Sequence, residues 1–196
     1  MTPLIFLIIC RYDIIFINTY KRDGKMATLI IYTTKTNATK DISHLIFHGL
    51  KDYENPIIIK NVKEVSAINL EDFQTIIIGA PMYMGYYPKK MREFIGKYLE
   101  ILKKKSLFMF LVGIDPKLDV SKFLKQSFPQ TFIKHLKMSI HVGGEVREEN
   151  LTLFKRYVLK QVIKESKNID ASNIGFNKQN INRLITEVKA SLEIEG

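Results

Sequence analysis

Short apolar runs alternate along the chain with longer segments in which apolar residues recur every three or four positions. Five runs are rich in β-branched and aromatic residues, and this composition predicts strands over residues 28–32, 57–59, 73–80, 107–114 and 137–142. Helical spacing follows or precedes them over residues 42–50, 89–102, 120–128, 151–165 and 178–193. The run over residues 73–80 carries no charge, which is typical of a strand that is covered on both faces.

Strand and helix alternate five times, and this order predicts an α/β fold of three layers. A five-stranded parallel sheet is expected between two layers of helices, with right-handed crossovers. We expect one domain over residues 26–196, because the chain shows neither an internal repeat nor a linker. Residues 145–177 depart from the alternation, and we interpret them as a basic helical insertion before the last helix.

Residues 1–25 do not fit this pattern. Their apolar runs, residues 4–10 and 14–17, are too short for a membrane span, which needs about 18 uncharged apolar residues. A basic start and a small-residue cleavage site are both missing, so a secretory signal is disfavoured. Two interpretations remain: a segment that lies at a membrane surface, or a natural start at Met26. We favour the second and expect residues 1–25 to be a non-native or poorly packed extension.

Charge restricts the choice of partners. The chain has 30 Lys and Arg against 20 Asp and Glu, a net charge of +10, and a pI near 9.5. This balance favours anionic partners such as nucleic acid, lipid headgroups or carboxylate-bearing small molecules. Nucleic acid fits poorly, because no recognition helix, aromatic RNA-binding strand or basic tail stands out.

Cysteine and histidine content argues against structural metal or disulfides. Cys10 is the single cysteine of the chain, which excludes a disulfide framework and suits a reducing, cytoplasmic setting. His44 and His48 are spaced to share a helix face, but no acidic residue stands between them as in zinc protease motifs. We therefore favour an exposed helix there and expect no protein-bound metal.

The first candidate site is the turn after the first predicted strand. Ligands of open α/β sheets bind beyond the carboxyl ends of the strands. Four threonines fall within residues 33–39, beside the first free amides of a predicted helix, and hydroxyls and amides of this kind bind phosphate. The turn is neither a Walker loop nor a dinucleotide fingerprint. The alternative is a threonine-rich helix start without a ligand.

The second candidate site follows the third predicted strand. Residues 79–88 combine two glycines with three tyrosines. A flavin ring needs aromatic or apolar walls and a close backbone approach, and both could come from this loop. A tyrosine-rich surface loop or an interface patch is the alternative. Since both loops belong to one sheet edge, we favour a flavin, with contacts from Ala80, Pro81, Met82, Tyr83, Met84, Gly85, Tyr86 and Tyr87.

The spacing of the hydroxyls resembles the phosphate loop of flavodoxins, Thr/Ser-X-Thr-Gly-X-Thr. Thr34, Thr36 and Thr39 fill its hydroxyl slots, and Asn37 stands where the family usually has Gly. Asn is the commonest residue besides Gly at positive φ, so the substitution is compatible with the loop. The resemblance implies a flavodoxin-like fold that binds FMN. The implied phosphate contacts are Thr33, Thr34, Lys35, Thr36, Asn37, Ala38 and Thr39.

Residues 26–196 are similar, more narrowly, to the menaquinone-dependent protoporphyrinogen dehydrogenase branch of flavodoxin domains. The likeness rests on residues 39–42 (TKDI), 79–80 (GA), 93–94 (EF) and 143–147 (GGEVR), and on the basic insertion. It implies an FMN-dependent oxidoreductase that oxidises a reduced tetrapyrrole and passes electrons to quinone, with the flavin carrying the chemistry. Further implied flavin contacts are Gly113, Ile114 and Asp115. Implied substrate contacts are Gly144, Glu145 and Arg147.

Two other functions stay open. One is a non-catalytic FMN electron-transfer protein whose basic surface docks an acidic redox partner. The other is an α/β binding module without flavin. The insertion helix could lie at an anionic membrane surface, although ordinary packing on the sheet is slightly favoured. We expect a cytoplasmic protein, with peripheral contact at the inner face of the membrane as the open alternative.

Overall fold

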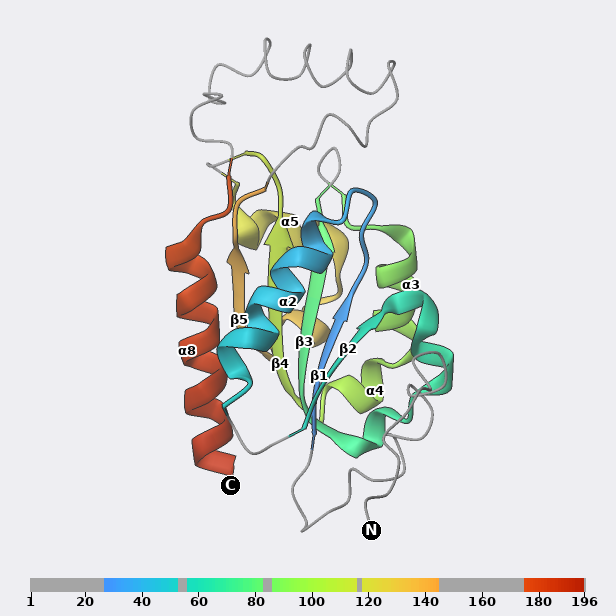
Figure 1. Cartoon of the computed structure of the whole chain (residues 1–196). Coiled ribbons are helices and arrows are strands. Elements are labelled where there is room, and N and C mark those ends of the chain that lie inside the picture. The colour runs from blue at the N-terminus through green and yellow to red at the C-terminus, as the bar shows by residue number, and fades with distance from the viewer. Residues whose placement is uncertain (1–26, 53–55, 83–85, 116–117, 145–174, 196) are drawn as a thin grey trace, which may run out of the picture.

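Five parallel strands form one sheet in a computed structural model that describes residues 27–52, 56–82, 86–115, 118–144 and 175–195. The strand order is β2-β1-β3-β4-β5 (Figure 1). All neighbouring strands run parallel, so their carboxyl ends share one edge of the sheet. The strands are β1 (Ala27–Tyr32), β2 (Ile57–Asn61), β3 (Phe73–Pro81), β4 (Ser106–Val112) and β5 (Leu136–His141).

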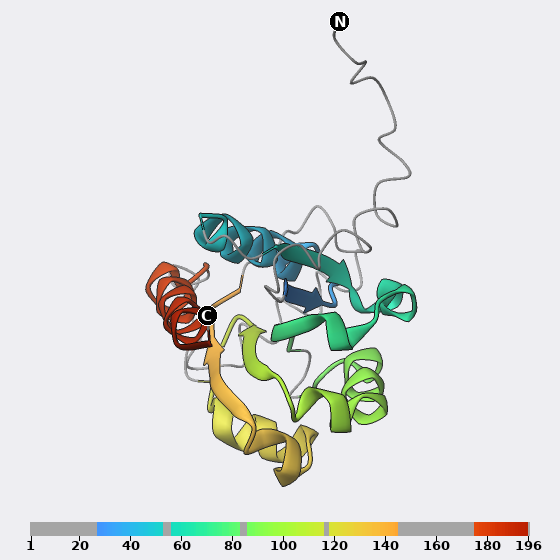
Figure 2. The same ribbon diagram turned by 90° about the horizontal axis from the view of Figure 1, so that it is seen from below.

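Helices cover both faces of the sheet. α2 and α8 pack on one face, and the remaining helices pack on the other (Figure 2). The first layer consists of α2 (Ala38–Leu50) and α8 (Lys178–Glu195). The second consists of η2 (Val62–Ala67), η3 (Leu70–Asp72), α3 (Lys89–Lys97), α4 (Leu99–Leu102), α5 (Val120–Ser127) and α6 (Gln130–Ile133). The predicted three-layer α/β fold with a five-stranded parallel sheet is confirmed.

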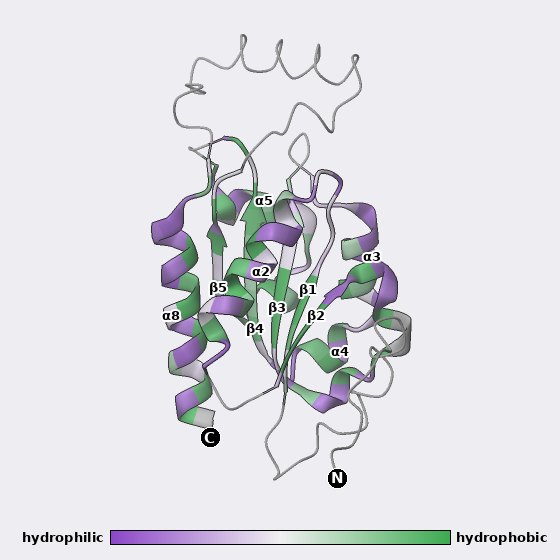
Figure 3. Cartoon of the chain, in the orientation of Figure 1, coloured by the Kyte–Doolittle hydropathy of each residue, from purple (hydrophilic) through white to green (hydrophobic). Residues whose placement is uncertain are grey.

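The alternation of side chains along each strand divides the core in two. On β3, Ile76 and Ile78 face the layer of α3 and α5, whereas Ile77 faces α2 and α8. All three side chains are fully buried, as expected for a strand covered on both faces. Figure 3 shows the same arrangement, with apolar strands between helices whose outer surfaces are largely polar.

The predicted helix over residues 89–102 is two helices. The backbone leaves helical geometry at Tyr98, with φ −109° and ψ 17°, and α4 begins directly after it. Periodicity missed this break because the apolar stripe continues through it. The sequence pattern did not predict the two 3₁₀ helices or α6, because segments of three to six residues are too short to show a helical period. The predictions for residues 1–25, for helix 151–165 and for most of the insertion fall outside the described residues.

The residues that follow β5 form hydrogen bonds with the residues that precede α8. Gly143 pairs with Phe176 in an antiparallel bridge, and the Gly144 amide donates to the Gly175 carbonyl at 3.1 Å. Gly143 has φ +74°, and a Cβ there would lie 2.2 Å from the Gly175 oxygen, so only glycine fits. The end of β5 and the start of α8 are therefore held next to each other.

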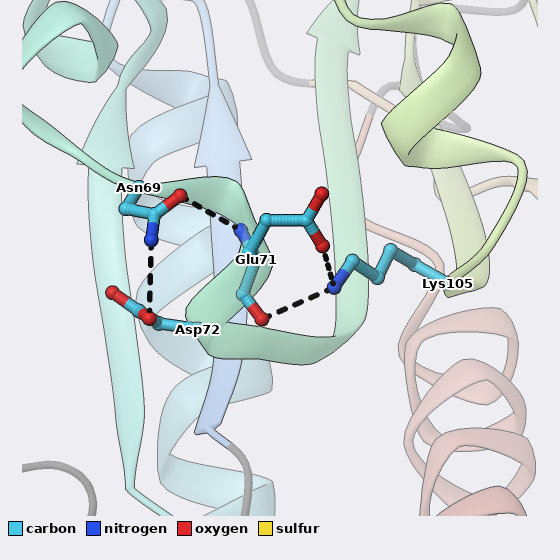
Figure 4. A network of polar contacts seen from close by, with 4 residues as sticks. All are labelled: Asn69, Glu71, Asp72 and Lys105. Atoms are coloured by element: carbon cyan, nitrogen blue, oxygen red, sulfur yellow. Dashed lines mark hydrogen bonds and ion pairs between the residues drawn. The ribbon is translucent and has the colours of Figure 1, made fainter.

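A polar network joins η3 to the start of β4 at the amino edge of the sheet (Figure 4). The Lys105 ammonium donates to the Glu71 carbonyl at 3.2 Å and pairs with the Glu71 carboxylate at 3.3 Å. Asn69 accepts from the Glu71 amide and donates to Asp72, which shapes the turn that Lys105 reaches. Because the Lys105 side chain is only 7% exposed, its charge depends on these partners.

Lys105→Met should lower the free energy of unfolding by about 1 to 3 kcal/mol, because it removes charge-assisted hydrogen bonds from a buried ammonium. Lys104→Met is the matched control: it removes the same charge from an exposed neighbour. Chemical denaturation of both variants measures the difference. Equal stabilities of the two variants would show that the network contributes nothing.

Candidate functional site

The two loops of the predicted site meet where the strand order reverses. β1 lies between β2 and β3, and the chain leaves β1 toward one face of the sheet and β3 toward the other. In this architecture, ligands usually bind at the carboxyl edge where the strand order reverses. The Thr33 amide donates to the Gly79 carbonyl at 3.1 Å, so the loop after β1 begins against the end of β3.

The turn after β1 contains a left-handed residue. Asn37 has φ 64° and ψ −12°, and it is the one residue other than glycine with positive φ in the described part of the chain. Its carbonyl accepts from the Asp41 amide at 2.9 Å, which starts α2. Asn37 thus adopts the conformation for which the flavodoxin loop usually has glycine, as its place in the sequence predicts.

The start of α2 holds hydrogen-bond donors that have no acceptor within the helix. The first amides of a helix have no acceptor within it, and the Asn37 side chain makes no capping hydrogen bond. Thr39 is fully buried, and its hydroxyl has no hydrogen-bond partner among the described residues. Thr34 and Thr36 are half-buried, and Lys35 is exposed. Amides, a hydroxyl without an acceptor and the positive end of the helix dipole together favour an anion here.

Tyr32 closes β1 beside this turn as an uncharged phenol. Burial, and next the Glu64 carboxylate, raise the pKa of Tyr32, whereas a hydrogen bond from Asn61 acts in the opposite direction. A phenol that stays protonated adds no negative charge beside an anion site. The turn therefore keeps its preference for anions.

The loop after β3 supplies apolar groups to the same edge. Ala80 and Pro81 are buried, and Met82 is half-buried with its amide donating to the Val112 carbonyl at 2.7 Å. Tyr86 is 68% exposed, so its ring is open to a ligand or a partner. Tyr83, Met84 and Gly85 lie outside the described residues.

Tyr87 is in the core, which contradicts its expected place in an aromatic wall. Its side chain is 1% exposed, and the ring packs against Phe123 and Phe128, with centroids 5.6 and 4.8 Å away. Burial strongly raises the pKa of the Tyr87 hydroxyl, so the group is a neutral phenol. The sequence of an irregular loop does not show which of two adjacent tyrosines, Tyr86 or Tyr87, points into the core.

Gly113, at the end of β4, does not offer the backbone contacts expected of it. Its amide donates to the Gly143 carbonyl at 3.0 Å, and its carbonyl accepts from the His141 ring at 2.8 Å. Both polar groups are thus used within the protein. Ile114 and Asp115 follow, half-buried, and stay predicted contacts. The sequence did not identify His141 as a site residue. The one feature that could have pointed to it is its position, a polar ring on the last residue of a strand.

Gly144 also differs from its predicted role in contacting a substrate. It is buried, and a Cβ there would lie 2.7 Å from the backbone of Gly113. Its lack of a side chain therefore permits two backbones to pack closely. The predicted substrate contacts Glu145 and Arg147 lie outside the described residues.

The described residues contain neither a metal-binding cluster nor a helix that could span a membrane. No group of three or more His, Cys, Asp or Glu side chains there is arranged to hold a metal ion, and His44 and His48 are both exposed on α2. Nor does this part of the chain contain a helix of sufficient length and apolar character to cross a bilayer.

Comparison with known families decides the assignment. Residues 29–173 match the flavodoxin domain. The chain belongs to the flavodoxin domain family. Members of this family typically bind FMN. The left-handed Asn37, the uncapped start of α2 and the orphaned Thr39 hydroxyl fit the phosphate of that cofactor.

Individual relatives of this flavodoxin domain are distant. The protoporphyrinogen IX dehydrogenase (quinone) of Escherichia coli strain K12 is 22% identical over 151 residues, which cover 72% of this chain and 81% of that protein. The solved structure of a short-chain flavodoxin associated with a PDU bacterial microcompartment is 10% identical. It covers 86% of this chain and 99% of its own, with a TM-score of 0.50. At this identity the structural likeness shows the fold.

Asn37→Ala should lower the free energy of unfolding by about 1 to 2 kcal/mol, because alanine disfavours the left-handed region. Asn37→Gly should stay within about 0.5 kcal/mol of the parent. Since the Asn37 side chain makes no cap hydrogen bond, the pair of variants compares backbone conformation. Thermal and denaturant unfolding without added ligand provide the measurement. An alanine variant as stable as the glycine variant would contradict the left-handed turn.

Proposed function

We propose that this flavodoxin domain binds FMN at the carboxyl edge between β1 and β3 and acts as an FMN-dependent oxidoreductase. The observation that carries the proposal is the buried Thr39 hydroxyl, which has no hydrogen-bond partner among the described residues. It lies at the start of a helix whose N-cap side chain, that of Asn37, makes no capping hydrogen bond. A buried hydroxyl left without a partner costs about 1 to 3 kcal/mol, and a phosphate oxygen would remove this cost. Family membership supports the same cofactor.

Different residues of the chain would bind the phosphate and the ring of FMN. The hydroxyls of Thr34, Thr36 and Thr39 and the first amides of α2 would hold the phosphate. Met82 and the exposed Tyr86 would supply apolar surface for the ring. When bound, FMN would supply the redox chemistry, a transfer of two hydrogen equivalents from a donor to a quinone acceptor.

We further propose that the donor is a reduced tetrapyrrole of the protoporphyrinogen type. Similarity to the Escherichia coli dehydrogenase supports this substrate class. Charge supports it as well: α3 has no acidic residue in its first turn, where Lys89, Lys90 and Arg92 are all exposed. Lys89 pairs with the exposed Glu93 carboxylate at 3.6 Å. Carboxylates on a substrate would offer Lys90 and Arg92 a further anion at the positive end of this helix.

The second candidate is an electron carrier that docks an acidic redox protein. The same cations favour it, together with the exposed Tyr86, since Tyr and Arg are enriched where proteins meet. The two candidates share FMN and differ in whether a small donor reduces it. The reaction with a tetrapyrrole therefore separates them.

Purified protein should take up FMN, and Thr39→Val should weaken that binding about fivefold or more, because the phosphate loses a hydroxyl contact. Thr75→Val is the matched control, since Thr75 is also fully buried, with no partner for its hydroxyl in the described part of the chain, but lies within the sheet. Titration followed by flavin fluorescence and absorption gives both dissociation constants. A wild-type protein that leaves added FMN free in solution would exclude the cofactor.

FMN-loaded protein should lose its oxidised flavin absorption when protoporphyrinogen IX is added without oxygen, and a quinone should restore it. The expected result is catalytic formation of porphyrin, measured by its fluorescence. Heat-denatured protein and free FMN serve as controls for uncatalysed oxidation. Bound flavin that protoporphyrinogen does not reduce would contradict the dehydrogenase and favour the carrier.

A further inference from the structure

The ends of β4 and β5 are joined beyond the last residues of the strands. Leu111 and His141 are register partners, and the Val142 amide donates to the Leu111 carbonyl at 2.9 Å. One step further, the Gly113 amide donates to the Gly143 carbonyl at 3.0 Å. The strands therefore stay paired up to the loop that follows β4.

A side chain completes this junction. The His141 Nε2 lies 2.8 Å from the Gly113 carbonyl oxygen. A carbonyl oxygen can only accept, so this ring nitrogen carries the proton and donates. The contact is partly buried and joins residues 28 positions apart. It thus fixes the Gly113 peptide from the direction of β5.

Gly113 needs such a restraint because glycine has the widest choice of backbone angles. A Cβ at this position would lie 3.2 Å from the Met82 Cε and 3.6 Å from the His141 Nε2. The residue is therefore flanked by the loop after β3 on one side and by His141 on the other. Gly144 packs against the Gly113 backbone as well: a Cβ on Gly144 would lie 2.7 Å from the Gly113 carbonyl carbon.

His141 is itself held by the first turn of α8. The Asn180 side-chain amide donates to the His141 carbonyl at 2.8 Å, and the Asn180 backbone amide donates to the Asn177 side chain at 2.9 Å. The Asn177 amide in turn donates to the Val142 carbonyl at 2.9 Å. This chain of contacts links the start of α8 to the loop after β4.

We propose that His141 is a positioning residue for the flavin site. Its ring fixes the Gly113 carbonyl and thereby sets the direction in which Ile114 and Asp115 leave the sheet toward the cofactor. A loop already held in its binding conformation loses less entropy when a ligand binds. The role in FMN binding rests on the function proposed above, whereas the restraint on the loop does not.

The test compares three variants. His141→Leu removes the donor, and His141→Gln can restore one through its side-chain amide. His135→Leu is the matched control: His135 immediately precedes β5 at the opposite edge, and its ring also contacts a backbone carbonyl, that of Thr131 at 2.7 Å. We expect His141→Leu to raise the dissociation constant for FMN about fivefold or more. His141→Gln should stay within about twofold of wild type, and His135→Leu should equal it.

Amide hydrogen exchange of the FMN-free variants tests the restraint without the cofactor. His141→Leu should speed exchange at residues 113–115 at least about fivefold, and His135→Leu should leave these amides unchanged. The inference is overturned if exchange and FMN affinity in His141→Leu both equal wild type, or if His135→Leu has the same effects. Wild-type protein that binds no FMN, with faster exchange in His141→Leu, would instead reject the proposed cofactor and retain the restraint.

Discussion

The hydrogen bond from the Thr33 amide to the Gly79 carbonyl is the contact on which the candidate site depends. It extends the pairing of β1 with β3 one residue beyond the end of β1, at the point where the chain leaves the two strands toward opposite faces. The threonine turn and the loop with Met82 therefore start from a shared, rigid base. Without this pairing the two loops would be independent, and a mononucleotide would have no fixed frame in which to bind both.

The helix starts at this edge combine exposed cations with acidic residues, which include Asp41 in the first turn of α2 and Asp119 at the N-cap of α5. Helices that follow parallel strands begin at the carboxyl edge, so the positive ends of their dipoles gather there. The first turns of α3, α5 and α8 contain no acidic residue, and Lys89, Lys122 and Lys178 are exposed in them. These lysines contribute to the net charge of +10 at the edge where phosphate and a substrate would approach.

The sequence predicted the strands and the order of layers because their signal is local. Runs such as residues 73–80 are apolar throughout, and Asn37 occupies a slot that demands positive φ. The remaining features depend on contacts between distant residues. The inward turn of Tyr87 depends on Phe123 and Phe128, and the bond of His141 to Gly113 depends on strand register. Neither pattern is visible in any short stretch of the chain.

The bridge between Gly143 and Phe176 has a consequence for how such a domain can diverge. Hydrogen bonds join the backbone just before residue 145 to the backbone just after residue 174. These bonds hold β5 and α8 together independently of the residues between them. Loop closure costs only about 0.6 kcal/mol for each doubling of length. Insertions and deletions between these joined ends therefore add little to the cost of folding, and they leave the candidate site after β1 and β3 in place.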